Sequence, residues 1–116
     1  MMRTLFVTLL LAFIASPAIA AKITPADAAA HVGQTVTVEG AVSEVFTSRR
    51  SNTTFINMGG RYPDHIFSAV IFASDAGTFP NVRALEGKTI DDTGRIRLYR
   101  GKPEIILHSA GQIGSR

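Results

Sequence analysis

Short stretches in which apolar and polar residues alternate follow one another from residue 34 to residue 108. In 34–46, Val36, Val38 and Val42 share one phase, whereas Val45 lies in the opposite phase, and Gly40 stands between them. A change of phase near an internal glycine is typical of a bent or bulged strand. We therefore predict a long, bent first strand over residues 34–46.

Four further strands are predicted along the chain. Residues 53–58 alternate, whereas residues 66–72 are apolar on both faces, which indicates a strand covered on both sides. A fourth strand is expected over residues 88–99 and a fifth over residues 103–108. Between the third and fourth strands, residues 74–85 predict a short helix that is interrupted by a glycine and a proline.

The segment 21–33 in front of these strands predicts a short N-terminal helix. Thr24 can act as its N-cap, Pro25 suits its first turn, and Gly33 can end it. Five strands with a helix between the third and the fourth form the arrangement of the OB fold. We therefore predict an all-β domain with short helices, a five-stranded OB-type Greek-key barrel over residues 34–113, followed by a tail, 114–116.

One residue departs from this pattern. Asp92 lies two positions after Ile90, where the phase of the fourth strand calls for an apolar side chain. A buried aspartate without a partner would cost several kcal/mol. We therefore expect Asp92 to lie at a bulge or to meet an arginine.

Residues 1–20 have the pattern of a secretory signal peptide. Arg3 gives a positive start, residues 5–14 are apolar, and Ala18-Ile19-Ala20 is a small-x-small cleavage site. The apolar run is shorter than the roughly 20 residues that cross a bilayer. We expect cleavage after Ala20, a periplasmic or secreted mature protein, and no membrane anchor after cleavage.

Composition and charge limit the chemistry that the mature protein can perform. The chain has 12 Lys+Arg and 9 Asp+Glu, so removal of Arg3 leaves a net charge of about +2, which permits an anionic partner without requiring one. Cysteine is absent, and His31, His65 and His108 lack the spacing of metal ligands. The acidic residues are scattered and no nucleophile motif is present. We expect no metal, no cofactor and no enzymatic activity.

Basic and aromatic residues gather in the segments through which OB barrels bind ligands, namely the loops between strands 1–2 and 4–5 and the strands beside them. Proteins that bind single strands combine a basic groove with aromatic rings on which bases stack. Rings that could stack are Phe55, Tyr62 and Tyr99, and Asn57 could bond to a base. The candidate cations are Arg49, Arg50, Arg61, Arg95, Arg97, Arg100 and Lys102.

Several stretches together resemble small bacterial OB-fold domains of the nucleic-acid-binding type, which occur alone behind signal peptides or appended to secreted nuclease-like proteins. They are VTVEGAV (36–42), TFINMGGRYP (54–63), AVIF (69–72), LEGKT (85–89) and LYRGKPEIIL (98–107). The resemblance covers about residues 34–113. It implies an OB barrel that binds single-stranded nucleic acid or a similar anionic ligand, although the fold itself serves many partners.

Two functions remain open. The first is binding of single-stranded nucleic acid, and the second is a non-enzymatic periplasmic module that binds a protein or a small ligand and has no nucleic-acid role. Convergence of the arginines on one concave face around an exposed aromatic ring favours the first. Scattered arginines, or arginines paired with Glu44, Asp91 and Glu104, favour the second.

Overall fold

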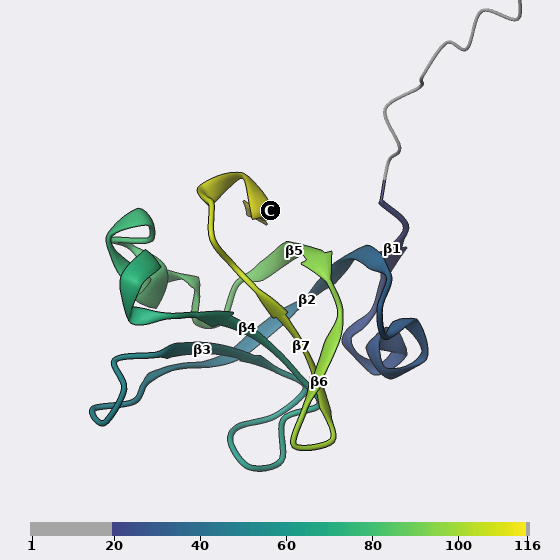
Figure 1. Cartoon of the computed structure of the whole chain (residues 1–116), viewed down its shortest axis with the longest axis horizontal. Coiled ribbons are helices and arrows are strands. Elements are labelled where there is room, and N and C mark those ends of the chain that lie inside the picture. The colour runs from purple at the N-terminus through teal and green to yellow at the C-terminus, as the bar shows by residue number, and fades with distance from the viewer. Residues whose placement is uncertain (1–19, 116) are drawn as a thin grey trace, which may run out of the picture.

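The computed structural model describes residues 20–115, which form a single mixed sheet with short 3₁₀ helices (Figure 1). The strands are β1 (Lys22–Ile23), β2 (Thr35–Thr47), β3 (Thr54–Met58), β4 (Phe67–Ile71), β5 (Thr89–Arg95), β6 (Arg97–Tyr99), β7 (Lys102–Ile106) and β8 (Ile113–Ser115). The 3₁₀ helices are η1 (Pro25–His31), η2 (Ala73–Thr78), η3 (Val82–Leu85) and η4 (Ala110–Gln112). Apart from Ala20, the predicted signal peptide lies outside the described residues. None of the helices in the described part has the length and apolarity needed to span a membrane.

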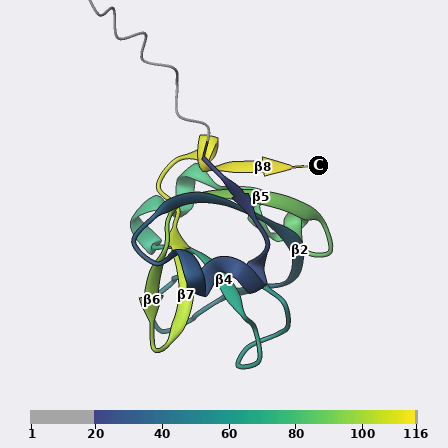
Figure 2. The ribbon, with the colours of Figure 1, turned by 90° about the vertical axis from the view of Figure 1, so that its right-hand side faces the viewer.

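The strand order is β6-β7-β4-β3-β2-β5-β8, with β1 paired parallel to β2. The pair β4–β7 is also parallel, and the remaining pairs are antiparallel. Hydrogen bonds do not join the two ends of this sheet. Seen end-on in Figure 2, the strands nevertheless lie around a ring, and η1 lies across its near end.

The predicted first strand, 34–46, corresponds to β2, which is long and bent as predicted. The first half of β2, from Thr35 to Ala41, pairs with β5, and its second half, from Val42 to Thr47, pairs with β3. The register shifts between Val42 and Glu44, which is the bulge that the change of hydrophobic phase indicates. One strand can therefore serve two parts of the curved sheet.

The predicted fourth strand, 88–99, is divided at Ile96 into β5 and β6. The buried Ile96 has backbone hydrogen bonds to the segment before β2: its N–H donates to Gln34, and its carbonyl accepts from Gly33. β5 pairs with β2, whereas β6 pairs with β7 at the other end of the sheet. The chain itself thus connects β5, which lies next to the edge strand β8, with β6 at the opposite edge of the open sheet.

The other differences from the sequence predictions concern the helices and the C-terminal end. The predicted helix 74–85 is two short 3₁₀ helices, and Pro80 lies in the gap between them. The N-terminal helix is a 3₁₀ helix of seven residues. Part of the predicted tail, 114–116, is a strand, because β8 pairs with β5.

Both expectations for Asp92 are wrong. Asp92 lies opposite Val38 in a regular stretch of the β2–β5 ladder, so it is not at a bulge. Its side chain is fully buried, and neither carboxyl oxygen has a hydrogen-bond partner among the described residues, so it does not meet an arginine. Burial, with a smaller contribution from the negative charge of Asp91, raises the pKa of Asp92 to about 7.

Candidate functional site

One face of the sheet carries two rows of side chains that run across its strands. Successive residues of a strand point to opposite faces, so residues paired across the ladders form rows on one face. The apolar row consists of Phe46, Phe55, Val70 and Ile106. The polar row consists of Glu44, Asn57, Ser68, Glu104 and Arg97. The two rows lie side by side and form the floor of the site.

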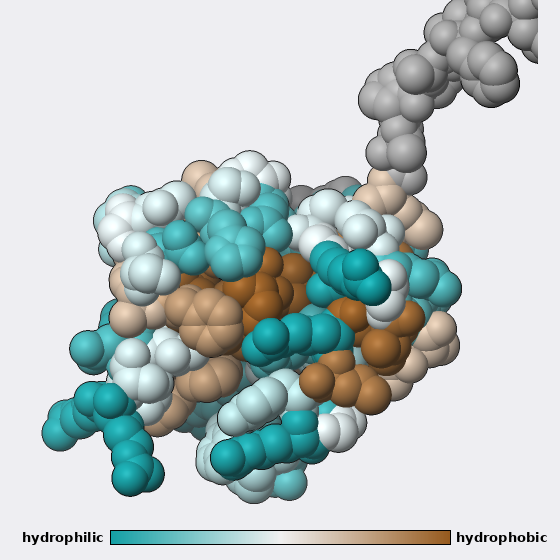
Figure 3. Space-filling view, viewed as in Figure 1, coloured by the Kyte–Doolittle hydropathy of each residue, from teal (hydrophilic) through white to brown (hydrophobic). Residues whose placement is uncertain are grey.

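A groove with a volume of about 500 Å³ lies over these rows, within the range of ligand-binding sites. It is lined by Phe46, Ser48, Phe55, Asn57, Tyr62, Pro63, His65, Ser68, Tyr99, Arg100, Lys102, Pro103 and Glu104. A smaller hollow shares Phe55, Tyr99 and Glu104 with the groove and continues it to Phe72 and Arg97. In Figure 3, apolar residues lie exposed near the middle of this face, with hydrophilic residues around them.

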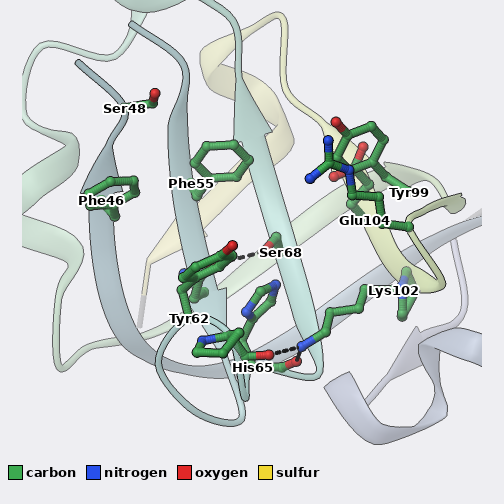
Figure 4. Close-up of a pocket in the computed structure, with 13 residues that line it drawn as sticks. Phe46, Ser48, Phe55, Tyr62, His65, Ser68, Tyr99, Lys102 and Glu104 are labelled. Carbon is green, nitrogen blue, oxygen red and sulfur yellow. Dashed lines mark hydrogen bonds between the residues drawn. The ribbon is translucent and has the colours of Figure 1, made fainter. Parts of the chain in front are cut away.

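Aromatic rings from four separate segments line the groove. Phe46 of β2 stacks on Phe55 of β3, with 6.5 Å between the ring centroids. Tyr62 comes from the loop between β3 and β4 and Tyr99 from β6, and these two side chains are 70% and 51% exposed. Figure 4 shows Phe55 in the middle of the groove, Tyr62 in front of it and Tyr99 across from it. Their exposed ring faces can stack on a flat ligand.

The polar row is largely saturated by its own hydrogen bonds. Asn57 Nδ2 donates to Glu44 Oε1 over 2.9 Å, and Ser68 Oγ donates to Asn57 Oδ1. At the other end of the row, Arg97 Nε donates to Glu104 Oε1 over 2.7 Å. Asn57, Ser68 and Glu104 are all buried. Both ends of the Asn57 amide are thus engaged within the row, and the side chain is only 1% exposed, which limits the bond between Asn57 and a base that the sequence suggests.

Glu44 also fixes the loop that carries Tyr62. The backbone N–H of Tyr62 donates to Glu44 Oε1 over 2.9 Å, and Arg61 pairs with Glu44 Oε2 over 3.1 Å. The hydrogen bonds from Tyr62 and Asn57 lower the pKa of Glu44, and the nearby charge of Arg61 acts in the same direction. The carboxylate therefore ties the exposed tyrosine to β2.

Lys102 and His65 fix the same loop from the other side. Lys102 Nζ donates to the backbone carbonyl groups of Pro63 and His65, the latter over 2.6 Å. Burial, followed by the charge of Lys102, lowers the pKa of His65, so its imidazole is neutral at neutral pH. This ring stacks on Tyr62 with 5.9 Å between the centroids. Tyr62 is thus positioned by contacts to its backbone and to its ring.

The predicted cations do not converge on one site. Arg61 and Arg97 pair with Glu44 and Glu104. Arg95 lies in β5 opposite Thr35, and the structure does not bring it to the groove. Two arginine pairs that the sequence analysis associates with the second function are therefore present.

Three other arginines remain without an acidic partner among residues 20–115. Arg49 and Arg50 are exposed at the tip of the β2–β3 hairpin, and Arg100 lies in the turn between β6 and β7 with its guanidinium 5.3 Å from the ring of Tyr99. Of the predicted site residues, the structure thus brings six to the groove: Phe55, Asn57, Tyr62, Tyr99, Arg100 and Lys102. Arg97 lies in its continuation.

Sequence reasoning missed Phe46, His65 and Glu104. Phe46 could have been found with the correct hairpin register, because the loop over residues 48–53 pairs Thr47 with Thr54 and so places Phe46 opposite Phe55. His65 and Glu104 carry no such signal, because a loop and a parallel strand pair bring them to the groove. Within the described part of the chain, no group of three or more His, Asp or Glu residues is placed to hold a metal ion.

Comparison with known proteins supports the fold alone. No protein-family model and no curated protein matches the sequence. The structure is similar to the crystal structure of "a putative aspartyl-tRNA synthetase from Leishmania major Friedlin", with a TM-score of 0.55 and 10% sequence identity over 88% of this chain. The chain spans 22% of the length of that synthetase chain. The mostly β, mixed and open sheet, with its short 3₁₀ helices, is consistent with an OB-like fold.

Proposed function

We propose that the groove binds single-stranded nucleic acid, with bases stacked on its aromatic rings. One observation carries the proposal: Phe46, Phe55, Tyr62 and Tyr99 come from four separate segments and line a single groove. Stacking of a base on an aromatic side chain contributes about 1–3 kcal/mol and tolerates any base. The contacts of Glu44, Lys102 and His65 hold Tyr62 in place before a ligand arrives.

The proposed fold is an OB-type Greek-key barrel in which β5 and β6 together act as its fourth strand. In that fold, ligands bind beside the loops that join strands 1–2 and strands 4–5. The corresponding segments here are the β2–β3 hairpin, which carries Arg49 and Arg50, and the β6–β7 turn, which carries Arg100. Arg100 lines the groove, and Arg49 and Arg50 follow Ser48, which also lines it. These three arginines are the proposed phosphate contacts.

The proposal extends to the location and the kind of activity. Residues 1–20 act as a cleavable signal peptide, and the mature protein is periplasmic or secreted. The protein binds its ligand and performs no catalysis on it, and it requires neither a metal nor a cofactor. Its basic residues favour an anionic ligand, and its rings favour one with flat, unpaired bases.

The test is fluorescence anisotropy of the mature protein with a labelled single-stranded DNA of about 15 nucleotides. Because Arg61 and Arg97 are neutralised, only Arg49, Arg50, Arg100 and Lys102 are expected to displace counterions. At about −0.7 per phosphate contact, the log–log slope of affinity against salt should lie between about −2 and −3. Duplex DNA of the same sequence should bind more weakly, because its bases cannot stack on the rings.

Substitution of the exposed rings separates stacking from charge. Tyr62→Ala with Tyr99→Ala should weaken binding at least about tenfold, because two stacking partners are lost. Val32→Ala is the matched control, since it truncates an exposed apolar side chain that does not line the groove. Undetectable binding of the single strand by the intact protein at low salt would contradict the proposal.

The second candidate is a module that binds a protein or a small ligand. The pairs Arg61–Glu44 and Arg97–Glu104 favour it, because they remove positive charge from the groove and leave a largely apolar surface with a polar rim. Such a module would show no binding of the oligonucleotide at any salt concentration.

A further inference from the structure

The polar row of the groove contains a carboxylate oxygen to which no hydrogen bond is made within the row. Glu104 is 5% exposed, and its Oε1 accepts from Arg97 Nε. Among the residues that the structure describes, no hydrogen bond is made to Glu104 Oε2. The side chain lines both the groove and its continuation. A buried carboxylate oxygen that faces a groove is a strong acceptor for a ligand donor, because water competes with it only weakly.

The other polar groups in the middle of the row are already engaged. Asn57 uses Nδ2 on Glu44 and Oδ1 on Ser68, and Ser68 uses its hydroxyl proton on Asn57. Both residues are buried. Glu104 therefore supplies, on the floor of the groove, a carboxylate oxygen that makes no hydrogen bond to residues 20–115 and can accept a strong, charge-assisted one from a ligand.

The surroundings of Glu104 fit the edge of a flat ring. Phe55 and Tyr99 line both parts of the groove together with Glu104. Figure 4 shows Glu104 beside Tyr99, across the groove from Tyr62. A base stacked on one of these rings would present its edge to the carboxylate. The guanidinium of Arg97 lies beside Glu104 and adds N–H donors next to this acceptor.

We propose that Glu104 accepts a hydrogen bond from the Watson–Crick edge of a bound base, so that the groove prefers bases with an exocyclic amino group. This preference rests on the nucleic-acid binding proposed above. Cytosine presents an amino donor next to the N3 acceptor, which matches the Glu104–Arg97 pair. Adenine has the same arrangement. Uracil and thymine present a carbonyl oxygen in place of the amino group, and their single donor on this edge, N3–H, lies between two carbonyl oxygens that repel a carboxylate.

The direct test compares oligonucleotides of deoxycytidine and deoxyuridine of equal length at mildly alkaline pH, where cytosine is unprotonated. The two bases have similar rings and differ at the edge that Glu104 is proposed to contact. The deoxycytidine oligonucleotide should bind about tenfold more tightly, as one good base-edge contact provides. A third oligonucleotide with N4,N4-dimethylcytosine keeps the ring but lacks both amino donors, and it should bind no more tightly than the deoxyuridine oligonucleotide.

The outcomes separate the two proposals. Equal affinities for deoxycytidine and deoxyuridine overturn base reading by Glu104 and leave nucleic-acid binding intact. Absence of binding to every oligonucleotide overturns the proposed function itself. Retention of tight binding by the dimethylated oligonucleotide also overturns base reading, because the preference would then not depend on the amino donors.

A substitution assigns the preference to Glu104. Glu104→Gln replaces the carboxylate by an amide that can donate as well as accept, so the ratio of the two affinities should fall to about twofold or less. Glu39→Gln is the matched control, because Glu39 lies in the half of β2 that pairs with β5 and does not line the groove. An unchanged ratio in a folded Glu104→Gln protein overturns the proposal. The dimethylcytosine comparison needs no variant and decides the question if Glu104→Gln does not fold.

Discussion

Glu44 holds the backbone of Tyr62, whose N–H donates to Glu44 Oε1 over 2.9 Å. The same carboxylate accepts from Asn57 and pairs with Arg61. A residue of β2 thus fixes the loop that presents the most exposed ring of the groove. The position of Tyr62 therefore depends on the charge of Glu44.

We predict that this contact weakens in acid and in the Glu44→Gln variant. The pKa of Glu44 is lowered in the folded protein. The ionised side chain therefore stabilises the folded state fully above the unfolded pKa, and this stabilisation is lost as pH falls through the lowered pKa. Loss of a hydrogen bond to a charged acceptor should accelerate amide hydrogen exchange at Tyr62 by at least about fivefold. Nuclear magnetic resonance at neutral pH measures the effect of the variant. Glu39→Gln is the control, and equal protection of Tyr62 in all three proteins would contradict the prediction.

Asp92 should destabilise the protein increasingly as pH rises from about 4 to about 7. Over this range the unfolded chain loses the proton of Asp92, whereas the folded protein, with its pKa raised to about 7 by burial, retains it. The difference from the ordinary value of 3.8 corresponds to an effect of at most about 4 kcal/mol. Asp92→Asn should remove this decline, so its advantage over the wild type in urea unfolding should grow between pH 4 and pH 7.

Asp64→Asn is the control for this prediction, because Asp64 is exposed in the loop before β4. It should leave the pH profile of the wild type unchanged. If the wild type and Asp92→Asn proteins have parallel profiles, Asp92 does not titrate with a raised pKa.

The strands could be predicted from the sequence because each has a local signal. The shift of phase after Val42 indicates the bulge of β2, and the apolar run 66–72 indicates the buried β4. The break at Ile96 has no such signal, since it depends on hydrogen bonds to the distant Gly33 and Gln34. The burial of Asp92 contradicts the usual preference of that residue, although the alternation that begins at Ile90 places Asp92 in the buried phase of the strand.

The candidate site could be predicted in part, for a similar reason. Phe55, Tyr62 and Tyr99 follow from their places in strands and loops, and all three line the groove. The charges could not be assigned, because pairing depends on the register between strands: Arg97 meets Glu104 only when β6 lies beside β7. Arg95 is two residues from Arg97, yet it belongs to another part of the sheet.

Gly40 should be required for the packing of η1 on the sheet. A Cβ atom at this position would lie 2.6 Å from Pro25 Cγ and 2.9 Å from Met58 Sδ, which is too close for either contact. Gly40→Ala should therefore lower the free energy of unfolding by about 1–3 kcal/mol, as overpacking does. Gly77→Ala is the matched control, because nothing lies within 4 Å of its Cβ position. Equal midpoints of urea unfolding for the two variants would contradict this account.

Arg97 and Arg95 should differ sharply when each is replaced by glutamate, although the sequence suggests equal roles. Arg97→Glu places a second carboxylate opposite the buried Glu104 and removes its partner, so unfolding should become easier by roughly 2 kcal/mol or more. Arg95→Glu should change stability by less than about 0.5 kcal/mol, because Arg95 is exposed and pairs with no acid among the described residues. It should also leave the affinity for the oligonucleotide within about twofold, since Arg95 does not line the groove. Urea unfolding and anisotropy measure both effects, and a strong loss of binding in Arg95→Glu would show that the ligand extends beyond the groove.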